Sequence, residues 1–178
     1  MSRPFLSFYT PTYKRPTLLA RCRASVGAQT IPCQHVVIED TVGLGIHGMY
    51  HDIPEHAHLV TGEYVHVLAD DDYLEAHDVA ERVQAVAFAK SSPEVILVRA
   101  IKNGMHLPSY TSGPPKLGQI DLGCVITRRD VWLAHVQDYG RRYEGDFDHV
   151  RAMWNCGRRF LFTDILFERG PAMHGRPE

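Results

Sequence analysis

The sequence of 178 residues has no long apolar run and no excess of either charge. Residues 1–20 carry Arg3, Lys14 and Arg15 among several prolines, so they contain neither the apolar centre of a signal peptide nor a membrane span. The formal net charge of -2 argues against strong nonspecific binding to nucleic acid, although a local basic patch stays open. We therefore expect a soluble, cytoplasmic protein.

Cysteine is scarce, and its spacing fits neither a zinc ribbon nor a disulfide framework, because no CxxC pair occurs. We expect core thiols in a reducing compartment, at Cys22, Cys33, Cys124 and Cys156. Among the eleven histidines, His47 and His51 would share a face if their segment were helical, as two zinc ligands can. Further ligands at a matching spacing are missing, so we favour histidines in a loop over a zinc site.

Glycine is missing from TPTYKRP, the turn after the first expected strand. Nucleotidyltransferases normally have a glycine-rich loop with a following Lys or Arg there, so this class is disfavoured. The strand itself ends in Thr10, whereas a HAD-like phosphotransferase needs a nucleophilic Asp at its end. Internal repeats and breaks in composition are also absent, which predicts one domain.

The hydrophobic pattern of the sequence predicts strands that alternate with helices. Strands are expected at residues 5–10, 34–39, 64–69, 95–101, 121–127 and 159–167, and helices at 17–28, 78–90, 129–136 and 146–155. The glycine-bearing segment 43–48 and the segment 103–119, rich in Gly, Pro and Ser, are expected to be loops. This order predicts an α/β fold with a largely parallel sheet, helices on both faces and ligands beyond the carboxyl ends of the strands.

Carboxylates follow two of these strands. Glu39 and Asp40 end the second strand, and Asp70, Asp71 and Asp72 follow the third. Adjacent carboxylates repel one another unless water, basic groups or a hard cation compensates them. Oxygen ligands suit Mg²⁺ or Mn²⁺, which also bind substrate phosphates, so a metal and a diphosphate-bearing substrate are predicted. A helix cap or solvated turn is the alternative for an acidic string.

The surroundings of these acids resemble family 2 glycosyltransferases, whose fold is GT-A. VHVLADDDYLE resembles the DXD segment of that family, SFYTPTYKRPTLLARCRASVGAQT its first strand and helix, and HVVIED its second strand. GQIDLGCVITRRDVW, GDFDHVRAMWNCGRRF and FLFTDILFERG resemble its acceptor segment, acidic motif and terminal strand. The resemblance implies one GT-A domain over residues 1–178, with a nucleotide-sugar-binding half at 1–102 and an acceptor-side half at 103–178.

The resemblance further implies a donor site at the strand ends. A Mn²⁺ or Mg²⁺ ion held by Asp72, with Asp70 helping directly or through water, would bridge the diphosphate of a nucleotide sugar, with a UDP-sugar favoured. Lys14 or Arg15 either meets phosphate or covers the surface. The other implied donor contacts are Thr10, Thr12, Asp40, Asp70 and Asp71.

On the acceptor side, Asp146 occupies the position of the family's catalytic base, and Asp148 is the second acid of that motif. Asp146 would take the proton of an unidentified acceptor hydroxyl in an inverting displacement. Gly145 stands where the family has Glu, so a helix-capping role for Asp146 and a nucleotide-sugar-binding module without turnover remain as alternatives. Several arginines make this half the more basic one: Arg128, Arg129, Arg141, Arg142, Arg158 and Arg159. They would favour an anionic acceptor such as a polymer, and the alternative is that they are solvated surface residues.

Overall fold

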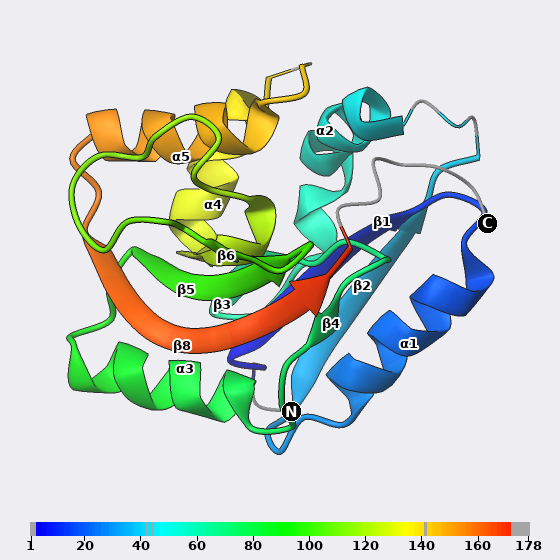
Figure 1. Ribbon diagram of the computed structural model, residues 1–178, viewed down its shortest axis with the longest axis horizontal. Coiled ribbons are helices and arrows are strands. Elements are labelled where there is room, and N and C mark those ends of the chain that lie inside the picture. The colour runs from blue at the N-terminus through cyan, green and yellow to red at the C-terminus, as the bar shows by residue number, and fades with distance from the viewer. Residues whose placement is uncertain (1–2, 42, 44, 141, 172–178) are drawn as a thin grey trace.

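The computed structural model describes residues 3–41, 43, 45–140 and 142–171, with only the backbone described at 46–49 and 51 (Figure 1). Its sheet has eight strands in the order β2-β1-β3-β7-β5-β8-β4, and β6 pairs with β5. The strands are β1 (Leu6–Thr12), β2 (Cys33–Glu39), β3 (Tyr64–Val67), β4 (Tyr73–Leu74), β5 (Val95–Lys102), β6 (Met105–Leu107), β7 (Val125–Arg128) and β8 (Phe160–Gly170). Only β4, β6 and β7 run antiparallel to their neighbours, so the predicted mostly parallel sheet is confirmed.

Helices cover both faces of this sheet, as the alternation of elements predicts (Figure 1). On one face lie α1 (Pro16–Gly27) and α3 (Val79–Ala89). On the other lie α2 (Gly45–His56), α4 (Arg129–His135) and α5 (Gly145–Asn155). Three short 3₁₀ turns, η1 (Ala57–Leu59), η2 (Leu122–Cys124) and η3 (Val136–Asp138), join these elements. No helix in the described part of the chain is long and apolar enough to cross a membrane.

The two faces have separate cores, and the strand β5 contributes to both. Ile96 packs with α1 and α3, whereas its neighbour Leu97 packs on the opposite face, because successive side chains of a strand alternate. The helix α3 meets its face with Val79, Val83 and Ala87, a stripe at a spacing of four residues. Burying each large apolar side chain contributes about 1.5–3 kcal/mol, so these stripes fix the helices on the sheet.

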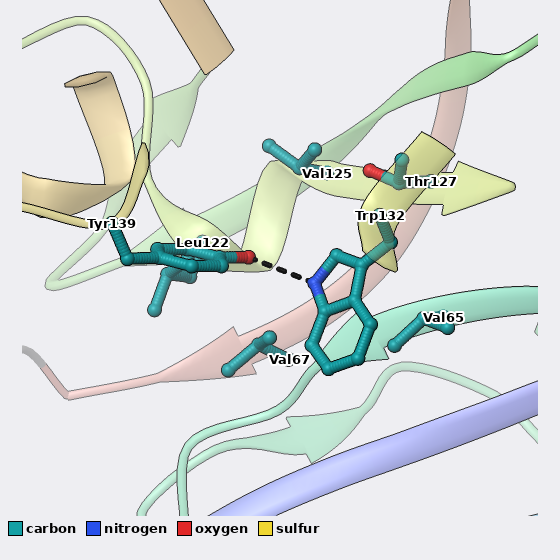
Figure 2. A pocket seen from close by; sticks show the side chains of 7 residues that line it. All are labelled: Val65, Val67, Leu122, Val125, Thr127, Trp132 and Tyr139. Carbon is teal, nitrogen blue, oxygen red and sulfur yellow. Dashed lines mark hydrogen bonds between the residues drawn. The ribbon is translucent and has the colours of Figure 1, made fainter. Parts of the chain in front are cut away.

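Trp132 and Tyr139 connect the helices of the other face (Figure 2). The indole Nε1 of Trp132 donates to the hydroxyl of Tyr139 at 3.1 Å. The Tyr139 ring stacks on His149 of α5, with ring centroids 3.8 Å apart, and on Tyr50 of α2 at 5.8 Å. The free volume between the side chains drawn in Figure 2 is about 0 Å³, so this region is packed core and not a ligand site. The stack fixes the start of α5 against α2.

Two expected loops contain regular structure. Segment 43–48 runs into α2, which begins at Gly45, because burial of Tyr50 and Ile53 outweighs the low helix propensity of its glycines. Segment 103–119 contains β6, which forms a hairpin with β5. The strand expected at 121–127 starts only after η2, and the two-residue β4 has no clear sequence signal.

The thiol prediction is only partly correct. Cys22 and Cys124 are buried, but Cys33 is partly buried and Cys156 is exposed at the end of α5. All four are free cysteines, consistent with the absence of CxxC pairs. The side chains of His47 and His51 lie outside the described residues.

Candidate active site

A cavity of about 580 Å³ lies at the edge of the sheet where the parallel strands end. Open α/β sheets bind ligands at this edge, and the volume is typical of sites for small molecules. The cavity is lined by six predicted site residues, Thr12, Asp40, Asp70, Asp71, Asp72 and Asp146. Residues from both halves of the chain therefore meet in one place.

Thr10, which the sequence also assigns to the donor site, does not line this cavity. Its side chain is fully buried, with Oγ1 2.9 Å from His35 Nε2 and 3.9 Å from the Cys22 sulfur. Thr12 stands two residues further along β1, and two strand residues span about 7 Å. The position of Thr10 is therefore inside the core, below the edge that Thr12 reaches.

Arg15 compensates the first two acids of the string. Its Nη1 lies 2.7 Å from Asp70 Oδ1 and 3.6 Å from Asp71 Oδ2, and its side chain is only 6% exposed. Thr12 donates from Oγ1 to the other oxygen of Asp70 at 2.7 Å. Burial raises the pKa of Asp71, although Arg15 lowers it. Of the two alternatives for Arg15, the structure excludes surface cover and puts the guanidinium on the cavity wall.

Lys102 compensates the third acid, and the sequence analysis missed it. Its Nζ pairs with Asp72 Oδ2 and lies 2.6 Å from Glu168 Oε1 and 3.5 Å from Asp121 Oδ1. We call Asp72, Asp121 and Glu168 the carboxylate cage. Burial alone would lower the pKa of Lys102, but the three carboxylates raise it well above its ordinary value. Lys102 therefore stays charged within the cage.

Glu168 is the deepest member of the cage and is held by His66 of β3. His66 Nε2 lies 2.8 Å from Glu168 Oε2, and His66 Nδ1 donates to the Val125 carbonyl at 2.9 Å. Burial raises the pKa of Glu168, but Lys102 and the hydrogen bond from His66 lower it further, so the net shift is downward. Burial and the charge of Glu168 raise the pKa of Asp72. Lys102 and His66 therefore stabilise the ionised form of Glu168.

Two glycines give the cage its close packing. A Cβ on Gly170 would lie 1.6 Å from Asp72 Oδ1, and a Cβ on Gly123 would lie 1.7 Å from Glu168 Oε1. Real Cβ atoms never approach other atoms so closely, so any larger residue would push a carboxylate out of place. The two carboxylates can pack around Lys102 because both neighbours lack a side chain.

The acids as arranged do not fit the predicted metal. Asp70 binds Thr12 and Arg15, and Asp72 binds Lys102 through one oxygen, while its other oxygen is buried against Gly170 without a hydrogen bond. Among the described residues, no group of three or more His, Cys, Asp or Glu could hold a metal ion. Mn²⁺ or Mg²⁺ at Asp72 and Asp70 stays a prediction, and no step below depends on it.

Asp146 lies in the first turn of α5 and lines the same cavity. Burial, followed by the charge of Asp121, raises the pKa of Asp146 to about 7. Asp148 differs, because Arg142 binds it at 2.6 Å and lowers its pKa. Of these two acids of α5, Asp146 lines the cavity and has a carboxyl that can exchange a proton near neutral pH.

Gly145, the departure from the family motif, has a packing reason. A Cβ at Gly145 would lie 2.7 Å from ring carbon Cδ2 of Tyr50. The Tyr50 ring is 2% exposed and lines the cavity beside Asp146. The aromatic ring of α2 thus supports the start of α5.

Asp40 also lies where the sequence predicts. Its amide donates to the Thr12 carbonyl at 2.8 Å, and its Oδ1 accepts from the Gly43 amide at 2.8 Å. It lines the cavity, whereas the neighbouring Glu39 is exposed and does not. The turn after β2 therefore presents one carboxylate to the cavity.

The arginines that the structure describes in the second half do not line the cavity. Those described bind neighbours instead: Arg128 pairs with Asp130, Arg142 with Asp148, Arg158 and Arg159 with Glu94, and Arg129 donates to the Val60 carbonyl. Arg141 lies outside the described residues. Three large hydrophobic residues that line the cavity are exposed, Met105, Leu117 and Tyr143, at 61%, 59% and 53%.

Comparisons with known proteins identify the fold. No protein-family profile matches the chain, and no curated protein sequence matches it. Among solved structures, S. aureus TarS 1-349 in complex with UDP-GlcNAc matches with a TM-score of 0.71 and 15% identity, over 96% of this chain and 59% of that one. The mannosyltransferase PcManGT from Pyrobaculum calidifontis, in complex with GDP-Man and Mn²⁺, matches with a TM-score of 0.66 and 16% identity, over 96% and 57%. The fold is therefore GT-A, and the chain spans less than two thirds of either structure.

Proposed function

We propose that this GT-A chain is a glycosyltransferase that moves a sugar from a nucleotide-sugar donor to a hydroxyl acceptor. The observation that carries the proposal is the cavity itself, which is lined both by the aspartates after β3 and by Asp146, a carboxyl with a pKa of about 7. The nucleotide sugars in the two similar structures, UDP-GlcNAc and GDP-Man, support this class of donor.

The donor would lie along the ends of β1, β2 and β3. Asp40 and Thr12 present oxygen atoms that can accept or share hydrogen bonds with the nucleotide base and ribose. Arg15 and Lys102 supply the positive charge that a diphosphate needs, since both line the cavity. A UDP-sugar is the first donor to test, because TarS binds UDP-GlcNAc, and a GDP-sugar is the second.

In the transfer step, the carboxylate of Asp146 accepts the proton of the acceptor hydroxyl while that oxygen attacks the anomeric carbon. The bond from the anomeric carbon to the diphosphate breaks, and its electron pair leaves with the diphosphate. Attack from the opposite face inverts the configuration, and a single base is sufficient. A glycoside hydrolase would need a second carboxyl as general acid, because its leaving group is a poor one.

The acceptor would approach across the apolar mouth of the cavity. Met105, Leu117 and Tyr143 offer apolar contact area, and the side chains of Arg128, Arg129, Arg142, Arg158 and Arg159 are bound to other groups. An acceptor with an apolar face, such as a sugar ring, suits this mouth better than an anionic polymer.

The test is release of nucleoside diphosphate from a panel of UDP, GDP, CDP and dTDP sugars, first without acceptor and then with candidate sugars. Asp146→Asn keeps the size of the side chain but cannot accept a proton, so turnover should fall about 10²–10⁴-fold while donor binding persists. Asp148→Asn is the matched control. Asp148 lies two residues further along α5 and does not line the cavity, so this variant should retain turnover. Donor binding without turnover in every variant would identify a binding module instead.

A further inference from the structure

The carboxylate cage already holds a cation. The ammonium of Lys102 contacts one oxygen from each of three chain segments: Asp72 after β3, Asp121 before η2 and Glu168 in β8. Its side chain is 7% exposed, and those of Asp72 and Glu168 are 4% and 0% exposed. A buried ammonium among oxygen atoms from separate segments has the surroundings of a bound metal ion.

This arrangement is built into the fold. Lys102 is the last residue of β5, where it pairs with Gly170 of β8. Glu168 stands two residues earlier in β8, on the same side of the strand, and His66 fixes it from β3. Gly170 and Gly123 leave room for the carboxylates of the cage, as described above. Backbone pairing, and not a flexible surface contact, therefore brings Lys102 to Asp72.

A divalent ion and this ammonium exclude each other at Asp72. A metal ion binds a carboxylate oxygen at about 2.1 Å, so an ion on Asp72 would lie within about 5 Å of the ammonium that the same carboxylate binds. Two positive charges at that separation in a buried site repel strongly. Asp70, the second predicted ligand, is held by Arg15 and Thr12.

We propose that Lys102 is the resident cation of the acidic site, and that the chain binds a nucleoside diphosphate without a divalent metal. The second part of this proposal, that a nucleoside diphosphate binds without a metal, rests on the proposed function, whereas the resident cation does not. Lys102 and Arg15 both line the cavity, so the charges that neutralise the aspartates are also those that a diphosphate meets. Removing the ammonium leaves the carboxylate cage without a cation. The three carboxylates of Lys102→Met can then rearrange around a metal ion, so this variant should gain a site that the wild type lacks.

The first experiment titrates Mn²⁺ alone and follows free Mn²⁺ by electron paramagnetic resonance. We expect no saturable binding to the wild type and one binding site in Lys102→Met. Lys90→Met, which removes an exposed lysine at the end of α3, is the matched control and should behave as the wild type. Saturable binding of Mn²⁺ to the wild type that Asp72→Asn abolishes would overturn the proposal.

The second experiment needs no variant and so does not depend on the folding of Lys102→Met. It measures the affinity of the wild type for UDP and for GDP by calorimetry, in EDTA and in saturating Mn²⁺. We expect a dissociation constant that agrees within about twofold between the two conditions, whereas a gain of about tenfold or more with Mn²⁺ would overturn the inference. If neither nucleotide binds in either condition, the proposed function fails, and the Mn²⁺ titration alone decides on the resident cation.

Discussion

Asp121 Oδ1 lies 3.5 Å from the Nζ of Lys102, and the charge of the same Asp121 raises the pKa of Asp146. One carboxylate thus acts on two groups that line the cavity, the ammonium of Lys102 and the carboxyl of Asp146. Asp121 keeps its place because its side chain accepts a hydrogen bond from the amide of Gly123 at 2.9 Å.

This relationship predicts a change in the pH profile. Asp146 must be ionised to accept a proton, so kcat/KM should rise with pH through about 7. Asp121→Asn removes a negative charge that disfavours ionisation, so the pKa of Asp146 should fall and the rising limb should move to lower pH. The check is the pH dependence of nucleoside diphosphate release. A limb that stays in place would show that burial alone sets the pKa.

Asp146 should also make stability depend on pH. Its pKa is about 7 in the folded chain and about 3.9 when unfolded, so its contribution is complete below about pH 4 and is lost as the pH rises through 7. Asp146→Asn should therefore be more stable than the wild type at pH 8, by up to about 4 kcal/mol, less where water screens the carboxylate, and not at pH 4.

Urea unfolding at both pH values measures this difference. Asp148→Asn supplies a control of opposite sign, because Arg142 lowers the pKa of Asp148. A group whose pKa is lowered by folding stabilises the folded chain at pH values above its unfolded pKa. This stabilisation is lost as the pH falls through the folded pKa. Equal stability of wild type and Asp146→Asn at pH 8 would contradict a buried, easily protonated Asp146.

Gly145 should not tolerate a side chain. Gly145→Ala places a methyl group against the Tyr50 ring, and overpacking of this kind costs about 1–3 kcal/mol of folding free energy. Gly27→Ala, at the end of α1, is the matched control because nothing lies within 4 Å of its added Cβ. Its melting temperature should equal or exceed that of the wild type, and only Gly145→Ala should lose turnover as Asp146 moves.

The Trp132–Tyr139 contact should behave as a buried hydrogen bond. Tyr139→Phe leaves the Trp132 N–H without its partner, which costs about 1–3 kcal/mol. Trp132→Phe removes the donor and leaves a hydroxyl unpaired, so the double variant should lose less than the sum of the two. A double-mutant cycle from urea unfolding gives the coupling, and additive losses would mean that the two groups do not interact.

The strands of this protein and the acids that follow them could be predicted from the sequence. β-branched runs predict β2 and β5. The parallel strands β2 and β3 end at the same edge of the sheet, so the sequence could group Asp40 with the aspartates after β3, and all of them line the cavity. The helix α2 could not be predicted, because its glycines argue against a helix and only the packing of Tyr50 and Ile53 reveals one.

The charge partners of the site could not be read from the sequence. Glu168 looks like any residue of an amphipathic strand, and its contact with His66 joins positions 102 residues apart. Lys102 precedes a segment expected to be a loop, so nothing in its neighbourhood indicates a buried ammonium. Sequence patterns report on neighbours along the chain, whereas the neutralisation of Asp72 depends on where β5 and β8 pair.

Gly170 and Asp72 should have a shared history of substitution. Because Asp72 Oδ1 fills the space of a Cβ on Gly170, the glycine cannot change while the carboxylate remains. During evolution Asp72 must therefore be lost before Gly170 is replaced. An aspartate cannot be accommodated again at position 72 while a larger residue occupies position 170. Asp72 could then be regained only after position 170 had returned to glycine.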